Sequence, residues 1–203
     1  EVFGINMVGL HENQPKLLNL KQILEAFISH RREIVTRRTI FELKKARGRA
    51  HVLEGQAVAL ANIDEVIALI KKSPTPGEAK AGLIARDWPP GAVGGMLDKA
   101  RMRDTRPHDL EEGFGLIDGS YRLSPILAQA ILDLRLHRLT GLEQDKIGKE
   151  YKELIDKIQV FLKILSDPDE LLKVIREELI EIRDEYGDER RTEISQDYSA
   201  LQD

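Results

Sequence analysis

The chain has no cysteine among its 203 residues. Disulfide bonds, thiol catalysis, iron–sulfur clusters and cysteine zinc sites are therefore excluded, and the composition suits a reducing cytoplasm. No apolar run approaches the roughly 20 residues that span a bilayer, and no signal-peptide pattern opens the chain. We expect a soluble chain without a membrane partner. Because "EVFGINMVGL" begins in mid-strand without a methionine, we also expect it to be part of a longer one.

Recognisable catalytic motifs are missing as well. The five histidines never fall in an H-x-x-x-H or H-E-x-x-H arrangement, which argues against a zinc site. "DPDE" resembles an acidic metal motif, but the proline and the leucines that follow are typical of a helix start. "PPGAVGG" lacks the G-K-[ST] ending of a phosphate-binding loop. We therefore predict no catalytic residue and no metal site in this chain.

Aromatic residues make up only 5% of the chain. Trp88, beside two prolines, is expected to fill a small core; a ligand platform is the less favoured alternative. Tyr151 and Tyr186 lie on apolar stripes, so we expect them in cores. Tyr121 and Tyr198 lie in loop or tail sequence with no nearby base or metal cluster. An enzyme with an unrecognised site near Trp88 is the weakest of the functional hypotheses.

Charge is distributed unevenly, although the net charge is only −4. Residues 21–49 carry nine Lys and Arg against three Glu, whereas residues 143–203 carry ten basic against eighteen acidic residues. The favoured interpretation is a solvated basic helix face that attracts the acidic segment. The alternative is a basic wall that meets passing nucleic acid.

Most of the chain has helical periodicity. Residues 2–10 read as a strand, and a helix is predicted from about residue 20 to about residue 70, with a possible Asn19–Gln22 cap. The middle, 73–124, carries most of the prolines and glycines and predicts short helices joined by turns. Within it, "RDWPPGAVGG" and "GFGLIDGSYR" are expected to be loop-like or short extended pieces. Apolar residues then recur at heptad spacing, namely Ile147, Tyr151, Leu154, Ile158, Phe161 and Leu165. A last helix follows Pro168 and carries an apolar stripe of Leu172, Ile175, Leu179, Ile182 and Tyr186, with Gly187 as its C-cap.

These elements predict a mainly α fold. We expect a long antiparallel two-helix coiled-coil stalk that carries a small globular helical dimerisation head, plus a remnant β-strand at the N-terminus. A coiled coil formed with another chain is the alternative. The intramolecular stalk is favoured because a head of about 70 to 90 residues separates the two helices, so they can pair with each other.

The stretch "ILDLRLHRLTGLE", residues 131–143, indicates that the predicted head has a second packing surface. If it is helical, its leucines, one isoleucine and two arginines form an arc of about 200°, about twice the width that one packing surface needs. We therefore predict that the head also contacts a second copy. The predicted contact residues are Leu132, Leu136, Leu139 and Leu142. Arg135, set among them, either forms an ion pair with Asp133 or Glu143 or meets a partner protein in a groove.

Four stretches carry a resemblance to a known family: "FGINMVGLHENQPKLLNLKQILEAFISHRREIVTRRTIFELKKAR", "AHVLEGQAVALANIDEVIALIK", "AQAILDLRLHRLTGLE" and "VIREELIEIRDEYGDERRTEI". They resemble the A subunits of bacterial DNA gyrase, which are type IIA DNA topoisomerases, in the later half of the breakage and reunion domain. The A-type subunit of topoisomerase IV is the paralogous alternative. A helical dimerisation or scaffold module without DNA function is the other hypothesis.

The resemblance implies a division of the chain. Residues 1–18 would end the tower region, 19–55 form the outgoing stalk helix, 56–142 form the C-gate dimerisation head, 143–166 form the returning helix, and 167–203 form a C-terminal helix and tail. The C-gate is the exit through which the transported DNA duplex leaves during ATP-dependent negative supercoiling. In this family the nucleophilic tyrosine follows an arginine, and no tyrosine here does. The chain alone is therefore expected not to cleave DNA.

The resemblance also implies partners and cofactors. We expect a homodimer through the head, a gyrase B subunit that completes an A2B2 complex, and a cytoplasmic, chromosome-associated location. Mg²⁺ and ATP would be held by the B subunit rather than by this chain. Arg135 matches the arginine of the "LDLRL" stretch, which plasmid-encoded gyrase-poisoning toxins contact. It is therefore expected to bind such an inhibitor.

Overall fold

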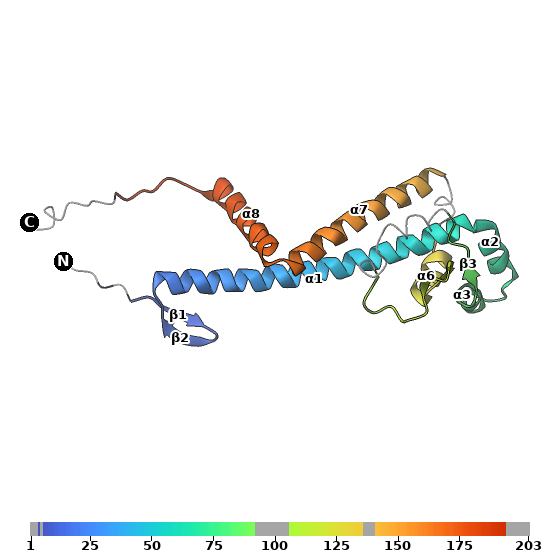
Figure 1. The fold of residues 1–203 in the computed structure, drawn as a ribbon, viewed down its shortest axis with the longest axis horizontal. Coiled ribbons are helices and arrows are strands. Elements are labelled where there is room, and N and C mark those ends of the chain that lie inside the picture. The colour runs from blue at the N-terminus through green and yellow to red at the C-terminus, as the bar shows by residue number, and fades with distance from the viewer. Residues whose placement is uncertain (1–3, 5, 92–105, 136–140, 194–203) are drawn as a thin grey trace, which may run out of the picture. The chain divides into compact units, whose positions relative to one another are not determined.

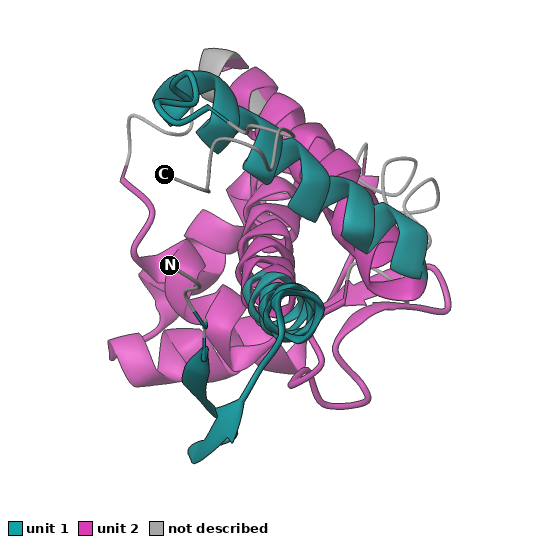
Figure 2. Cartoon of the chain, turned by 90° about the vertical axis from the view of Figure 1, so that its left-hand side faces the viewer, with its two compact units in different colours: residues 1–38, 167–203 teal, residues 39–166 magenta. Residues whose placement is uncertain are grey.

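The computed structural model describes residue 4 and residues 6–91, 106–135 and 141–193, with the backbone alone for 142–144. The chain divides into two compact units (Figure 2). Unit 1 comprises residues 1–38 and 167–203, and unit 2 comprises residues 39–166. The described part is mainly helical, as predicted, with two small antiparallel sheets (Figure 1).

Unit 1 begins with a β-hairpin. Strands β1 (Val8–His11) and β2 (Gln14–Leu17) pair antiparallel. The linking residues Glu12 and Asn13 have φ of 54° and 60°, the backbone of a two-residue hairpin turn that matches the twist of the strands. The strand predicted at the N-terminus is thus one half of a hairpin. The sequence "HENQPK", residues 11–16, supplies the turn and most of the second strand.

Helix α1 (Leu20–Ala61) starts as predicted. The Asn19 backbone N–H donates to Gln22 Oε1, and the Gln22 N–H donates to Asn19 Oδ1, both at 2.9 Å. This reciprocal cap satisfies two donors that the first turn leaves without a helical partner.

The end of α1 lies earlier than the predicted residue of about 70. Asn62 separates α1 from helix α2 (Ile63–Lys72). Its side-chain amide donates to the Val58 carbonyl at 2.9 Å and to the Pro89 carbonyl at 2.8 Å. An asparagine side chain that binds backbone groups offers the chain an alternative to continued helix, and here it also holds the segment after Trp88.

The rest of unit 2 alternates short helices and strands. Helix α3 (Pro76–Ala85) leads into strand β3 (Asp87–Trp88), and strands β4 (Gly115–Ile117) and β5 (Ser120–Arg122) complete an antiparallel sheet of order β3-β5-β4. The β4–β5 turn is Asp118–Gly119, with φ of 47° and 83°. The three strands lie in the two stretches predicted as loop-like or short extended pieces, and the Asp-Gly pair that joins β4 to β5 is a hairpin signal.

Three more helix starts are capped by side chains. Thr75 Oγ1 accepts from the Glu78 N–H at 3.3 Å in α3, and Ser124 Oγ accepts from the Leu127 N–H at 3.4 Å in helix α6 (Pro125–Leu132). Asp167 Oδ1 accepts from the Asp169 N–H at 2.9 Å in helix α8 (Pro168–Tyr186). Each helix has proline in its first turn, where the missing N–H costs no helical hydrogen bond.

Helix α7 (Gly141–Ser166) packs against the part of α1 that belongs to unit 2 (Figure 1). Arg49 of α1 binds Glu150 of α7, while Leu43, earlier in α1, lines the same cavity as Leu165, late in α7. The two segments therefore run antiparallel. The predicted heptad residues face this contact: Ile147, Tyr151 and Ile158 are buried, and Leu154, Phe161 and Leu165 are partly buried against the same core. That the pair is a coiled-coil stalk, and that the chain has the five predicted segments, stay predictions.

The helix considered for residues 131–143 does not extend over residues 133–135. Helix α6 ends at Leu132, Asp133 is its C-cap, and α7 begins at Gly141. The Asp133 carboxylate accepts from the Gln129 side-chain amide at 3.2 Å. Aspartate is a weak helix former because its side chain can bond nearby groups outside the helix, and this suits the end of α6 here.

Within the described residues, no helix has the length and apolarity needed to cross a membrane.

Candidate functional site

The end of α6 is where the predicted dimer contact begins. Leu132 is half-buried against the core, Leu134 is half-buried, and Arg135 is exposed outside the helix. Leu136 and Leu139 lie outside the described residues, and the Leu142 side chain is not described although its backbone is in α7.

The ion pair considered for Arg135 is not formed among the described groups. Asp133 accepts hydrogen bonds from Gln129 instead, and the Glu143 side chain lies outside the described part. Arg135 is therefore an exposed residue beside the half-buried leucines of the same segment.

The buried face of α6 is held close to α1. Leu127, Ala128 and Ile131 are buried, and a Cβ atom at Gly55 would lie 2.6 Å from Leu127 Cδ2. No side chain larger than hydrogen fits at Gly55 unless Leu127 moves, since real Cβ atoms do not approach other atoms this closely. The glycine thus sets the distance between the two helices.

A polar contact fixes the start of α6. His51 of α1 places Nε2 2.9 Å from Ser124 Oγ, and both residues are buried. Because the same hydroxyl caps α6 through Leu127, one short chain of hydrogen bonds joins α1 to the first turn of α6. The helix start at Ser124 is predictable from sequence. The contact with His51 is not, because no local pattern indicates a partner 73 residues away.

Next to this contact lies a partly buried carboxylate, that of Glu54. Glu54 accepts from Tyr151 Oη at 2.8 Å and from Tyr121 Oη at 3.1 Å, and the His51 Nδ1 atom lies 3.9 Å from it. Burial, and then the negative charge of Glu54, raise the pKa of both tyrosines above their ordinary value of 10.0. The hydroxyls therefore stay protonated and serve as donors that tie α1 to α7 and β5.

The tyrosine predictions are partly wrong. Tyr151 is buried as expected, but Tyr186 is 72% exposed, and Tyr121, expected in a loop, is fully buried in β5. Tyr198 lies outside the described residues. Trp88 fills the core, as predicted: it is fully buried, and its Nε1–H donates to the Leu83 carbonyl at 3.0 Å. A platform for a ligand is incompatible with that burial.

The basic segment pairs with acidic residues within each unit. In unit 2, Arg49 forms a two-bond pair with Glu150 at 2.7 Å and 3.0 Å. In unit 1, Arg31 and Arg38 both bind Glu178 of α8. These arginines of the basic segment therefore form ion pairs with the acidic segment of the same chain, as the favoured interpretation predicted.

Groups that could ligate a metal are scattered in the part of the chain that the structure describes. These residues contain no group of three or more His, Asp or Glu side chains arranged to hold an ion. That the whole chain holds no metal stays a prediction.

The geometry defines a helical protein in which a paired α1 and α7 carry a short helix, α6, whose end offers leucines and an arginine. The chain belongs to the family of DNA gyrase and topoisomerase IV A subunits, whose sequence model matches residues 1–180. It is 60% identical over 193 residues to the DNA gyrase A subunit of Aeromonas salmonicida, 58% to that of Pseudomonas aeruginosa and 59% to that of Escherichia coli. These matches cover 95% of this chain but only 21–22% of each relative, about a fifth of its length.

Proposed function

We propose that this chain forms the exit gate, or C-gate, and the primary dimer contact of a DNA gyrase A subunit, through which a transported duplex leaves during ATP-dependent negative supercoiling. Its membership of the gyrase and topoisomerase IV family supports the enzyme class. The observation that carries the gate proposal is the end of α6. There a helix anchored on its buried face leads into a leucine-rich connection to α7.

A gate needs an apolar contact on a rigid support. Helix α6 has that support, because Ser124 fixes its start through His51 and Leu127 packs against Gly55. Of the proposed contact residues, Leu132 ends that anchored helix, and Leu136, Leu139 and Leu142 follow it in the sequence. An interface built from a few leucines buries a modest area and separates more readily than a large obligate one.

The dimer contact is tested by sedimentation equilibrium of the full-length protein. Leu132→Glu and Leu139→Glu place charges in the proposed interface, so we expect weaker self-association. Ile126→Glu is a matched control on the same helix, because Ile126 is 65% exposed and is not among the proposed contacts. Equal self-association of all variants contradicts the proposed contact.

The gate itself is tested by closing it covalently. This chain has no cysteine, so Leu139→Cys adds one thiol to it. In the complete A2B2 enzyme, a disulfide between two heads is expected to stall supercoiling after strand passage, and a reductant is expected to restore turnover. Unaffected turnover by the cross-linked enzyme favours a scaffold without a role in DNA exit.

The chemistry of the reaction is assigned to other parts of the enzyme. We propose that ATP and Mg²⁺ are held by the B subunit, and that this chain by itself does not cut DNA. The expected location is cytoplasmic, with the chromosome. A basic lining formed by charges of α1 would contact passing phosphates weakly and in a salt-dependent manner.

Arg135 is proposed as a contact for a gyrase-poisoning toxin that enters the parted gate. Its exposure beside half-buried leucines supports this role. Arg135→Cys is expected to abolish toxin binding while the protein remains dimeric, whereas Arg135→Lys retains the charge and is expected to retain part of the affinity. Full toxin binding by the cysteine variant contradicts the role.

The second candidate is an A-type subunit of topoisomerase IV. It is kept because the matching family includes both enzymes. Introduction of negative supercoils by the complete enzyme favours gyrase, and decatenation without supercoiling favours topoisomerase IV.

A further inference from the structure

Two oppositely charged side chains lie at the end of α6, in the segment where we propose the dimer contact. Leu132 and Leu134 are half-buried, whereas Asp133 and Arg135, which alternate with them, are exposed. Only one residue separates the acid from the base, so their Cα atoms are at most about 7 Å apart. We call Asp133 and Arg135 the rim pair, because both charges are left to solvent beside the partly covered leucines.

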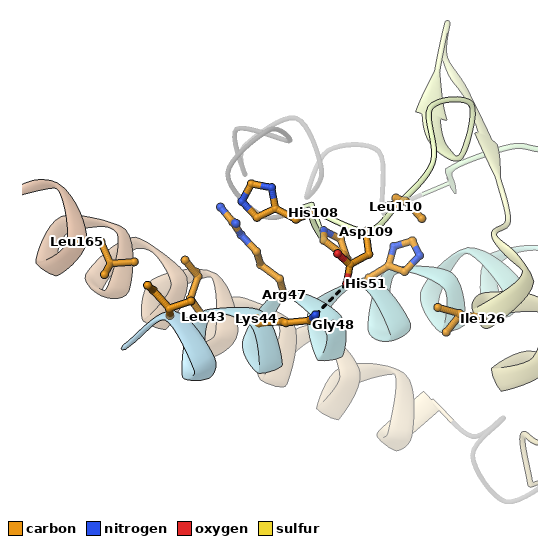
Figure 3. A pocket seen from close by; sticks show the side chains of 12 residues that line it. Leu43, Lys44, Arg47, Gly48, His51, His108, Asp109, Leu110, Ile126 and Leu165 are labelled. Carbon is orange, nitrogen blue, oxygen red and sulfur yellow. Dashed lines mark ion pairs between the residues drawn. The ribbon is translucent and has the colours of Figure 1, made fainter. Parts of the chain in front are cut away.

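Several other opposite charges of unit 2 meet within the chain. Lys44 binds Asp109 at 3.0 Å beside a cavity of about 520 Å³, where Gly48 leaves part of the wall open (Figure 3). Arg49 binds Glu150 at 2.7 Å. In the part of the chain that the structure describes, by contrast, neither member of the rim pair forms an ion pair. Both charges can therefore meet a partner from outside this chain.

The Asp133 carboxylate is held in place without losing its charge. Gln129, one turn earlier in α6, donates its side-chain amide to Asp133 Oδ1 at 3.2 Å and to Oδ2 at 3.3 Å. Gln129 Oε1 in turn accepts from Lys80 Nζ of α3 at 3.3 Å. Because an amide is uncharged, it orients the carboxylate but does not neutralise it. A group that is oriented before binding loses less conformational freedom in the contact.

We infer that the rim pair forms two symmetry-related ion pairs across the dimer contact, Asp133 of each copy with Arg135 of the other. A two-fold contact sets the same patch of both copies face to face, so each residue meets the other's partner twice. A patch with one acid beside one base is complementary to itself under that symmetry. A partner with charge of a single sign would use only half of it. The inference rests on the proposed dimer contact and names the charges that align it.

The ion pairs fix the alignment of the leucine contact more than they add to its affinity. Charge complementarity mainly excludes wrong alignments, and exposed ion pairs contribute little each. A neutral substitution such as Arg135→Cys removes the attraction without adding repulsion, so the dimer persists. When the gate parts, Arg135 loses its partner and is open to the toxin proposed above.

The first test inverts each charge in the full-length protein and measures self-association by sedimentation equilibrium at low salt. Asp133→Arg gives each copy two arginines at the contact, and Arg135→Asp gives each copy two aspartates. Because like charges then face each other, we expect at least about tenfold weaker self-association of either variant. Asp133→Arg/Arg135→Asp exchanges the charges and is expected to return to within about threefold of the parent protein. Glu112→Arg inverts an exposed acid before β4 and, as the matched control, is expected to have no effect.

The second test mixes the two inverted variants, one of which carries an affinity tag. A copy with two arginines attracts a copy with two aspartates, so the mixed dimer is expected to exceed the share that random pairing gives. Tagged and untagged parent protein supply that random share. The excess is expected to shrink in about 1 M salt, where the Debye length is about 3 Å.

The third test concerns Gln129 as a positioning residue. Gln129→Ala is expected to weaken self-association about twofold to fivefold, because the Asp133 carboxylate is no longer oriented. In an Asp133→Asn background the same change is expected to have no further effect on self-association. A loss that persists in that background overturns this role of Gln129.

Three outcomes overturn the inference. They are inverted variants that associate as the parent protein does, an exchanged double variant that is no stronger than the single variants, and a mixed dimer at its random share. The variants Leu132→Glu and Leu139→Glu distinguish two failures. If they weaken self-association and the inverted variants do not, the dimer contact stands and the ion pairs are refuted. If neither set weakens it, the dimer contact is refuted as well.

Discussion

Helix α1 passes through two environments that cover its apolar residues differently. In unit 2, Leu43, Ala46, Ala50 and Leu53 are 0–7% exposed, because α6, α7 and the small sheet pack around them. In unit 1, four similar residues are 37–52% exposed, namely Ile23, Leu24, Phe27 and Ile28. Apolar content therefore does not decide burial along this helix. What decides it is whether a partner element covers that face of the helix, since Val35 is buried in unit 1 while Ile40 and Phe41 are exposed in unit 2.

The two units also differ in where their polar contacts lie, in the core or near solvent. In unit 2 the partly buried Glu54 accepts hydrogen bonds from Tyr121 and Tyr151, which belong to the core. In unit 1 the described contact between α1 and α8 includes Glu178, which binds Arg31 and Arg38 at the edge of solvent. We therefore expect unit 2 to be sensitive to changes of volume and unit 1 to be more sensitive to salt.

The largest expected effect comes from removing apolar volume in unit 2. Leu127→Ala removes a fully buried side chain and is expected to lower the free energy of unfolding by about 2–5 kcal/mol, through lost burial and a residual cavity. Ile28→Ala in unit 1 is the control and is expected to cost less than about 1 kcal/mol, because Ile28 is already 43% exposed. Urea unfolding monitored by circular dichroism measures both. Equal losses would remove the distinction between the units.

Adding volume is expected to have the next largest effect. Gly55→Ala places a methyl group against Leu127 and is expected to cost about 1–3 kcal/mol of stability. Gly48→Ala, in the same helix but facing open space, is expected to stabilise the protein by about 0.5–1 kcal/mol. The double variant Gly55→Ala/Leu127→Ala should lose less stability than the sum of the two single losses, because alanine at position 127 relieves the clash with the new methyl group. Additive costs would show that the contact does not limit α6.

High pH is expected to destabilise unit 2 progressively. The pKa values of Tyr121 and Tyr151 are raised above 10.0 in the folded chain, mainly by burial, so unfolded tyrosines lose protons first. The contribution of these two hydroxyls to the free energy of unfolding is fully present below pH of about 10. Above that pH it falls by about 1.4 kcal/mol per pH unit for each tyrosine. Urea midpoints between pH of about 9 and 11 measure the slope. Tyr151→Phe should reduce the pH dependence of stability, and Tyr186→Phe, which changes an exposed residue of unit 1, should not. An equal slope in the parent protein and both variants contradicts the proposed role of the buried tyrosines.

The smallest effect is expected at the ion pairs of unit 1. Glu178→Gln weakens two charge-assisted contacts at once and is expected to cost about 1 kcal/mol at low salt. Glu33→Gln removes one exposed pair with Arg37 within α1 and is expected to cost about 0.3–0.5 kcal/mol. Thermal melting at low and high salt compares them. A cost at Glu178 that salt does not reduce would mean that packing, and not charge, joins α8 to α1.

Local features of the fold were predictable because their causes are local. The caps at Asn19, Thr75, Ser124 and Asp167 use side chains two or three residues from the groups they satisfy. The heptad seam of α7 was also readable, since its spacing places residues such as Ile147 and Ile158 on one face whatever that face meets. The Asp118–Gly119 turn carries an equally local hairpin signal.

Features that depend on distant partners were missed. The leucines after Ile131 favour a helix, yet the chain leaves α6 at Asp133. Tyr186 lies on an apolar stripe but is exposed, whereas Tyr121 comes from a loop-like sequence and is buried because β5 lies over Glu54. For Tyr121 a tertiary contact outweighs the local propensity, whose free energy per residue is small.

The sequence by itself determined the helix starts, the family and the residues offered for a gate, because capping, periodicity and motif identity reside in neighbouring residues. Only the tertiary structure decided which apolar residues are covered, that His51 reaches Ser124, and that Gly48 opens a cavity while Gly55 closes a contact. These depend on which side chains meet across long separations in the chain, and burial and hydrogen bonding act between those partners and not along the sequence.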